Sequence, residues 1–271
     1  MYKLTLNDGN KIPSLGLGTY QMDKDKIPKL LSTSFEKGYR LIDTASLYGN
    51  QNEIGRFFQG LNIPRNEIFI TSKLWNDSHY DVQSSLNKTL NELKLDFIDL
   101  YLIHWPSTKN GNYVNAWVEM IKLKEIGLIK SIGVSNFTEN QIINLIDKTG
   151  YPPAVNQLEV HLQYQKRESL LWHKDKKITI QAWSPLWTGN ISDENMKKLT
   201  CLSANYNKTI FQIALRWHIQ RGIGAIPKTS NTNRIVENSE IFDFHLSEND
   251  MFFLSSLDRN KKIIEYPDDY I

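Results

Sequence analysis

The sequence predicts an α/β fold, a (β/α)8 TIM barrel, and three observations lead to this prediction. Short apolar runs typical of β-strands recur along the chain of 271 residues. Segments with apolar residues at helical spacing separate most of these runs, and strand–helix alternation of this kind favours a parallel sheet with crossover helices. Eight such units in roughly 250 residues match the size of a closed barrel.

The eight expected strands are short and mostly rich in Ile, Leu and Val. In chain order they occupy residues 15–18, 38–42, 68–71, 98–103, 129–134, 154–157, 178–182 and 223–226. Helical apolar spacing is clearest in the segments 82–93, 117–124, 142–146 and 210–219. Each of these segments lies between two expected strands, as a crossover helix must.

Two segments lie outside this alternation. Residues 4–12 resemble a hairpin with Asp8-Gly9 at its tip, and they precede the barrel in a position to cover its N-terminal mouth. Residues 246–257 are predicted to form a helix in which Ser247 is the N-cap and Asp250 completes a capping-box pattern. We therefore expect one domain over residues 1–271, a barrel with an N-terminal β-hairpin and an extra C-terminal helix, ending in a loose tail at 266–271.

Composition and charge exclude several classes of protein. Lys and Arg total 32 against 30 Asp and Glu, a balance that does not suit a dedicated nucleic-acid binder. The single cysteine, Cys201, suits a reducing compartment. No secretory signal is visible at the N-terminus, and no apolar stretch reaches the roughly 18 residues of a membrane helix. We expect a cytoplasmic monomer that binds neither membranes nor nucleic acids.

Four polar residues follow three consecutive expected strands, at the end of a parallel barrel where active sites form. They are Asp43, Tyr48, Lys73 and His104. A lysine ammonium beside a phenol lowers the phenol's pKa from its usual value of about 10. A buried lysine needs a carboxylate to stay charged, and a neutral histidine can orient a carbonyl group. Each residue alone is more often structural, but their arrival in neighbouring loops predicts a catalytic site.

Three longer motifs accompany these residues. They are GYRLIDTA at 38–45 leading to YGN at 48–50, IGVSNF at 132–137 and IPKTS at 226–230. With these motifs the chain resembles the aldo-keto reductase family over essentially its whole length. The resemblance implies NADPH-dependent, reversible reduction of aldehydes and ketones to alcohols. It also implies that Tyr48 is the general acid, that Lys73 and Asp43 tune it, and that His104 positions the carbonyl.

The resemblance further implies how the small molecules bind. A substrate pocket would be lined by Tyr20, Trp75 and Trp105. Basic side chains would give charge-assisted bonds to the 2′-phosphate of the cofactor. The implied NADPH contacts are Ser135, Asn136, Gln157 and Trp183 for the nicotinamide, Asp43 for its ribose, Ser184 and Leu186 for the pyrophosphate, Lys228, Ser230 and Arg234 for the 2′-phosphate, and Glu237 and Asn238 near the adenine.

Other readings remain open at this point. The chain has no Gly-x-Gly-x-x-Gly motif, which a Rossmann-type dehydrogenase would need, and its histidines show no metal-ligand spacing, so no metal is expected. A Schiff-base aldolase on the same fold would use Lys73 as nucleophile. A barrel that binds the cofactor without turnover would serve as a sensor or binding subunit. Asp43 and Tyr48 suit a charged lysine, which disfavours the aldolase.

Overall fold

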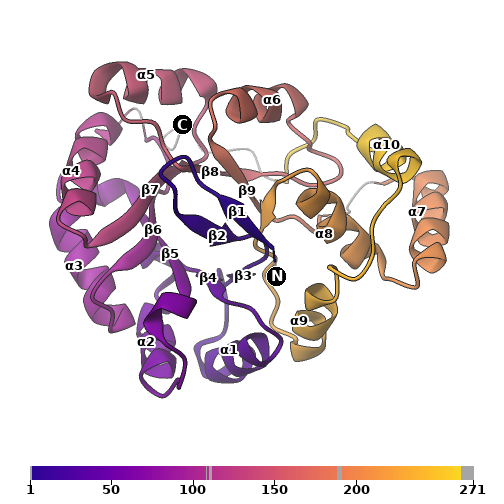
Figure 1. The fold of residues 1–271 in the computed structure, drawn as a ribbon, viewed down its shortest axis with the longest axis horizontal. Helices are drawn as coiled ribbons and strands as arrows, with labels where there is room; N and C mark the ends of the chain where they lie inside the picture. The colour runs from indigo at the N-terminus through magenta and orange to yellow at the C-terminus, as the bar shows by residue number, and fades with distance from the viewer. Residues whose placement is uncertain (1, 108, 110–111, 188–190, 264–271) are drawn as a thin grey trace.

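The computed structural model describes residues 2–107, 109, 112–187 and 191–263. At its centre lies an eight-stranded sheet whose neighbouring strands are parallel and follow chain order from β3 to β10 (Figure 1). The expected strands are confirmed, with boundaries that move by a few residues at most. The strands are β3 (Leu17–Gly18), β4 (Leu41–Asp43), β5 (Phe69–Leu74), β6 (Ile98–Ile103), β7 (Ile129–Ser135), β8 (Val155–Glu159), β9 (Thr179–Trp183) and β10 (Gly224–Ala225).

The first and last strands of the sheet meet and close it into a barrel. Parallel bridges join Leu15 to Ala225 and Gly18 to Lys228. A Cβ on Gly18 would lie 2.9 Å from the carbonyl oxygen of Ile226, so only glycine permits the two backbones to approach this closely. The predicted (β/α)8 barrel is therefore confirmed.

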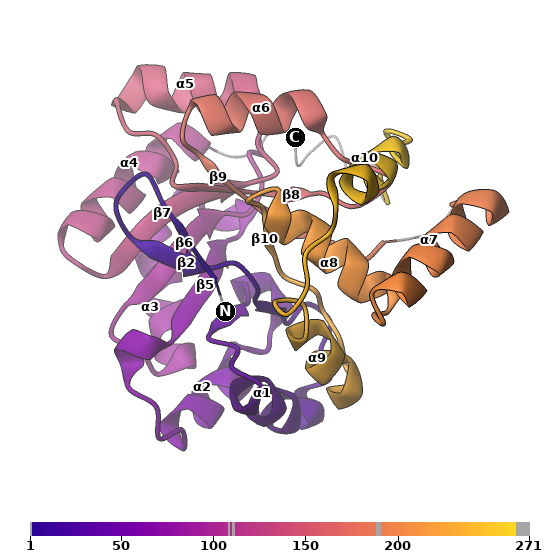
Figure 2. The same cartoon turned by 45° about the vertical axis from the view of Figure 1, so that its right-hand side comes forward.

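Helices form a ring around the outside of the barrel, as Figures 1 and 2 show from two directions. Contacts run around the ring from α9 to α1, α2, α3, α4 and α5, and α8 packs on α7 and α9. Among the described residues, no helix is both long and apolar enough to cross a membrane. The helices are α1 (Ile27–Glu36), α2 (Gln51–Gln59), α3 (Val82–Leu93), α4 (Tyr113–Glu125), α5 (Glu139–Thr149), α6 (Arg167–Asp175), α7 (Asp193–Asn205), α8 (Ile210–Gln220), α9 (Thr232–Ser239) and α10 (Glu248–Ser256).

The N-terminal hairpin lies across one end of the barrel, in front of the strands in Figure 1. Its strands β1 (Lys3–Thr5) and β2 (Lys11–Pro13) pair antiparallel. Leu6 and Ile12 are buried with apolar side chains from several barrel strands, and the Asn7 amide donates to the Pro153 carbonyl at 2.9 Å. The expected hairpin and its position over the N-terminal mouth are both confirmed.

Side chains on the barrel strands alternate between two cores. In β6, Leu100 and Leu102 lie in the cluster inside the barrel, whereas Tyr101 and Ile103 pack in the cluster between the strands and the helices. This alternation is the period of two expected of a strand. It determines which residues near the strand ends face the barrel's interior.

The C-terminal helix α10 begins as predicted. The Ser247 hydroxyl accepts a hydrogen bond from the Asp250 N–H, and the Asp250 carboxylate accepts one from the Ser247 backbone N–H, so the capping box is complete. Leu254 of this helix is buried in a cluster with Leu199 of α7 and Trp217 of α8. The tail expected at 266–271 lies outside the described residues.

Candidate active site

The strand period brings the predicted catalytic residues to one end of the barrel. Asp43, Lys73 and His104 each lie two or four residues beyond an interior side chain of β4, β5 or β6, so all three face inward at the C-terminal ends of these strands. Tyr48 ends the short 3-10 helix Ser46–Tyr48, and Gly49 after it has a left-handed φ of 64°. That glycine turns the chain back toward α2, which suits its lack of a Cβ.

Lys73 is the centre of a buried polar network. Its ammonium donates to the Asp43 carboxylate at 2.5 Å, to the Thr44 carbonyl at 3.0 Å and to the Tyr48 hydroxyl at 3.2 Å. These three bonds use all the donors of an ammonium group. Since the Lys73 side chain is 0% exposed, its charge is stabilised by these three protein groups.

Charge and burial set the protonation states within this network. Burial alone would lower the pKa of Lys73, but Asp43 and Tyr48 raise it above its usual value, so the ammonium stays charged. Burial raises the pKa of the Tyr48 phenol, and although Lys73 acts to lower it, the net pKa is above its usual value. The expectation that Lys73 lowers the pKa of Tyr48 is therefore right for the direction of that interaction and wrong for the net shift. Burial outweighs the ammonium, and Tyr48 is a protonated phenol at neutral pH.

His104 lies beside Tyr48 and is neutral. Burial and the neighbouring Lys73 charge hold the pKa of its imidazole well below the usual range. Its ring lies edge-on to the rings of Tyr48 and Trp75, with centroids 5.9 and 5.1 Å away. Its Nδ1 is buried and has no hydrogen-bond partner within the described part of the chain. A neutral imidazole at this position can orient a polar group without competing for the phenol's proton.

Amide and hydroxyl groups lie next to the network. Gln157 donates from Nε2 to the second Asp43 oxygen and to Gln181, both at 2.7 Å. Asn136 donates to the Ser135 hydroxyl at 3.0 Å and accepts from the Trp183 indole at 3.0 Å. The structure thus brings the four predicted nicotinamide contacts together beside Asp43.

One cavity of about 430 Å³ opens over these groups. All three predicted substrate-pocket residues, Tyr20, Trp75 and Trp105, line it together with Tyr48 and His104. None of its lining residues carries a formal charge apart from what His104 could gain on protonation. The cavity therefore presents aromatic walls around one phenol and one imidazole.

A second cavity of about 430 Å³ adjoins the first and shares Tyr48, Gln157 and Ser184 with it. It extends past Asp43 and Leu186 to Lys228 at the end of β10. The remaining predicted cofactor residues line neither cavity. Ser230 and Arg234 are exposed, Asn238 is buried, and the Glu237 carboxylate accepts from the Thr209 hydroxyl at 2.6 Å.

Ile263 lines both cavities and is not among the residues predicted from the sequence. The Ile263 N–H donates at 2.6 Å to the carboxylate of Glu159, which is fully buried and also bonds His161 at 3.1 Å. Upstream, the N–H groups of Arg259 and Lys261 donate to the Gln163 carbonyl at 3.0 and 3.1 Å. The end of β8 and the loop after it thus hold residues 259–263 beside the site. No local sequence signal reveals such a contact, because the partners are about a hundred residues apart.

The described residues contain no group of three or more His, Cys, Asp or Glu side chains that could hold a metal ion. His173 and His218 are buried and bond neighbouring groups of the fold, such as Asn156 for His173 at 2.9 Å and the Val160 carbonyl for His218 at 3.0 Å. These histidines are structural, as is the Glu159–His161 pair.

Comparison with known proteins identifies the family that has this barrel and this site. The chain belongs to the Aldo/keto reductase family, whose model matches residues 14–259.

Several relatives are similar along nearly their whole length. Methylglyoxal reductase DkgA from Yersinia pestis is 42% identical over 260 residues, which covers 96% of this chain and 94% of the relative. The protein of the same name from Escherichia coli K12 is 40% identical and covers 98% and 97%. Among solved structures, an aldo/keto reductase from Brucella melitensis has 41% identity and a TM-score of 0.88, covering 95% and 99%. A Bombyx mori aldo-keto reductase in complex with NADP has 32% identity and a TM-score of 0.90, covering 100% and 99%.

Proposed function

We propose that this protein catalyses the NADPH-dependent, reversible reduction of aldehydes and ketones to alcohols. One observation is the main support for this proposal. The Tyr48 phenol oxygen accepts a hydrogen bond from the fully buried Lys73 ammonium, and the phenol lies beside a neutral His104. The rings of Tyr48 and His104 both line an aromatic cavity. A proton donor, a cation that stabilises its conjugate base and a neutral orienting group are what addition of hydride to a carbonyl requires from a protein.

The residues present fit NADPH. The amide and hydroxyl groups of Ser135, Asn136 and Gln157 suit a nicotinamide carboxamide, and the Trp183 indole beside them suits the flat ring. From there the second cavity leads along Ser184 and Leu186 to the exposed Lys228, the order in which ribose, pyrophosphate and 2′-phosphate follow the nicotinamide. When bound there, NADPH supplies the hydride. The relatives named for methylglyoxal reduction and for an NADP complex support this choice.

The protein's own part is to deliver a proton and to fix the carbonyl. Tyr48 donates its phenolic proton to the carbonyl oxygen. The Lys73 ammonium, 3.2 Å from the phenol oxygen, stabilises the phenolate left behind. Asp43 keeps Lys73 charged, and His104 holds the carbonyl oxygen toward Tyr48. The raised pKa of the phenol keeps the donor protonated before the reaction.

This proposal is tested by kinetic assay of NADPH consumption with small aldehydes and ketones, including methylglyoxal. We expect saturable turnover with at least one of them and accumulation of the alcohol. Borohydride trapping of a substrate on Lys73 would instead support the aldolase. Cofactor binding without turnover for any carbonyl compound would support a sensor or binding subunit.

The first prediction concerns the choice between NADPH and NADH. Lys228 lies at the exposed end of the second cavity and Arg234 is exposed outside its lining, and each charge-assisted bond to a 2′-phosphate contributes about 1.5–3 kcal/mol. NADPH should therefore bind at least ~10-fold more tightly than NADH, as measured by quenching of tryptophan fluorescence. Arg234→Ala should reduce this preference, whereas Arg56→Ala, which removes an exposed arginine on α2, should leave it unchanged. Equal affinity for the two cofactors in the unmodified protein would contradict the assignment of Lys228 and Arg234 to the 2′-phosphate.

A second prediction concerns the charge of the substrate. The first cavity has aromatic walls and no Lys, Arg, Asp or Glu in its lining, and a charge moved there from water would lack a partner. We expect kcat/KM for para-methylbenzaldehyde to exceed that for para-carboxybenzaldehyde by ~10-fold or more, a difference of about 1.4 kcal/mol. The two compounds have similar size, and neither the methyl group nor the ionised carboxylate strongly activates the carbonyl. A preference for the carboxylate would mean that a cation outside the cavity lining reaches the substrate.

A further inference from the structure

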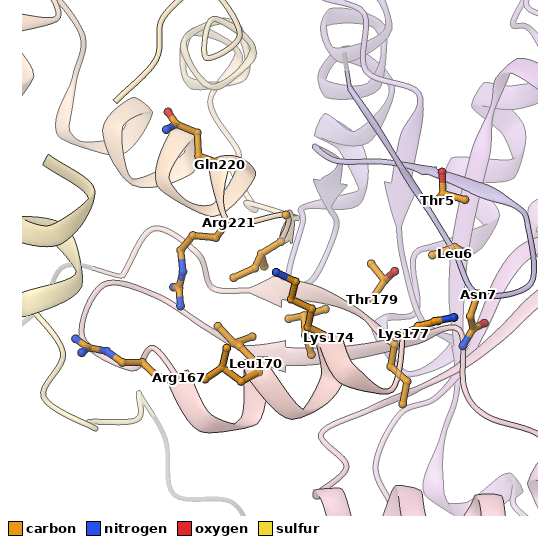
Figure 3. Close-up of a pocket in the computed structure, with 15 residues that line it drawn as sticks. Thr5, Leu6, Asn7, Arg167, Leu170, Lys174, Lys177, Thr179, Gln220 and Arg221 are labelled. Atoms are coloured by element: carbon orange, nitrogen blue, oxygen red, sulfur yellow. The ribbon is translucent and has the colours of Figure 1, made fainter. Parts of the chain in front are cut away.

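A larger hollow lies at the opposite end of the barrel from the candidate active site. It has a volume of about 810 Å³ and shares no lining residue with the two cavities described above. Thr179 at the start of β9 and Ile223 just before β10 line it, as does Leu6 of the hairpin turn. Its size lies within the range of about 300–1,000 Å³ typical of small-molecule sites. We call it the hairpin-side cavity (Figure 3).

One wall of the hairpin-side cavity is a patterned face of α6. Arg167, Leu170, Leu171 and Lys174 line it, and their spacing of three, four and seven residues places them on one face of the helix. The two cations are separated along the helix by about 10 Å, from a rise of 1.5 Å per residue. Between them lies an apolar stretch in which Leu171 is 69% exposed. A second lysine, Lys177, follows the end of the helix on the same wall.

The opposite wall adds a further cation, at the end of α8. Arg221 is half-buried, its guanidinium lies 4.1 Å from the centre of the Trp217 ring, and its Nη1 is buried with no hydrogen-bond partner among the residues that the structure describes. Burial and the neighbouring Arg167 lower the pKa of Arg221 to about 10, so it remains charged at neutral pH. Figure 3 shows the Arg221 side chain extending from the end of α8 toward the α6 face that carries Arg167 and Leu170.

Few carboxylates lie near these four cations. The lining contains Arg167, Lys174, Lys177 and Arg221 and no Asp or Glu. Of the four, only Arg167 forms an ion pair within the described residues, with Asp258 at 3.5 Å, and this one carboxylate also acts on Arg221. A cavity with this lining raises the local concentration of anions. Two arginines at one end and two lysines toward the other, with leucines between them, favour a ligand that is charged at both ends and apolar in the middle.

We propose that the hairpin-side cavity binds a small organic dianion, with phosphate or carboxylate groups at its two ends and an apolar body about six carbons long. One end lies between Arg167 and Arg221, and guanidinium groups suit it because they bond oxyanions in a fixed fork geometry. The other end reaches Lys174 and Lys177. The apolar body covers Leu170 and the exposed Leu171. A concave site with cations at its ends suits such a molecule better than it suits a nucleic acid, which needs a continuous basic surface.

Calorimetric titration of the full-length protein with hexanediol bisphosphate tests this proposal. We expect saturable binding at one site, at least ~10-fold tighter than binding of inorganic phosphate, which lacks the apolar body, or of hexanediol, which lacks the charges. Binding should weaken as salt is added. Equal affinity for inorganic phosphate and for the bisphosphate, or no detectable binding of the bisphosphate, would overturn the proposal.

Variants locate the binding and separate it from the active site. Arg221→Gln and Lys174→Gln should each weaken hexanediol bisphosphate by ~10-fold or more, since each removes one charge-assisted contact. Lys174 is exposed and has no ion-pair partner in the described structure, so its substitution leaves the fold intact. Lys148→Gln on α5, the matched control, and Lys228→Gln in the proposed cofactor cavity should leave binding unchanged. Loss of binding in Lys228→Gln but not in Arg221→Gln or Lys174→Gln would place the anion in the cofactor cavity and contradict the proposal.

Discussion

Tyr48→Phe is expected to lower kcat for carbonyl reduction by about 10²–10⁴-fold, the range that general acid catalysis contributes. The substitution removes the phenolic proton and keeps the ring, which packs edge-on against His104 and at a tilt against Tyr20, at centroid distances of 5.9 and 5.0 Å. The expected loss is therefore chemical, and the protein should keep its fold.

Binding of NADPH supplies the control for this variant. No cofactor contact is assigned to the phenol, so fluorescence titration should give a similar dissociation constant for Tyr48→Phe and for the unmodified protein. Substitution of Tyr20, the neighbouring ring, by Phe should lower kcat far less, because Tyr20 is 51% exposed and does not bond Lys73. Near-full activity of Tyr48→Phe would mean that another group supplies the proton.

Lys73→Met is expected to lower both activity and stability. The variant leaves the buried Asp43 carboxylate with its Gln157 bond at 2.7 Å but without its cation. Breaking a buried pair in this way costs about 3–5 kcal/mol of unfolding free energy. Reduction should also slow, because the phenolate formed at Tyr48 loses the ammonium that stabilises it. Denaturant unfolding and steady-state kinetics measure the two effects separately.

The stabilisation that the Lys73–Asp43 pair provides should change with pH in a direction that can be measured. The pKa of Lys73 is higher in the folded protein than its usual value of 10.5. The stabilisation that the pair provides is therefore complete below that usual value and is lost as the pH rises through the folded-state pKa. The difference in unfolding free energy between the unmodified protein and Lys73→Met should shrink at strongly alkaline pH. The matched variant Lys88→Met, on an exposed face of α3, should show neither the loss of stability nor this pH dependence.

Much of the fold could be predicted because local patterns determine it. The strand at 98–103 has the predicted bounds, and the Ser247–Asp250 capping box forms as expected. The period of two along β4, β5 and β6 also explains why Asp43, Lys73 and His104 meet, since an even step from an interior residue leads to the interior again. These features depend on residues that are near one another in the chain.

What could not be predicted depends on distant partners and on burial. Ile263 reaches the site because Glu159 accepts its N–H, a contact between segments 104 residues apart. The net pKa of Tyr48 depends on how deeply the fold buries the ring, which outweighs the effect of Lys73. Lys174 and Lys177 belong to a run of charges with no motif of its own. Only the packing of α6 beside the end of α8 brings them to a cavity with Arg221.

The most direct test of the proposed reaction is the fate of the transferred hydrogen. The protein would be incubated with methylglyoxal and with NADPH that carries deuterium at the reactive carbon of the nicotinamide, and the product would be examined by mass spectrometry and NMR. We predict an alcohol with one deuterium on the former carbonyl carbon and an exchangeable hydroxyl proton, and we predict that Tyr48→Phe yields far less of it at the same cofactor occupancy. Product without deuterium, or no product while NADPH is bound, would contradict the assignment of this site as a carbonyl reductase.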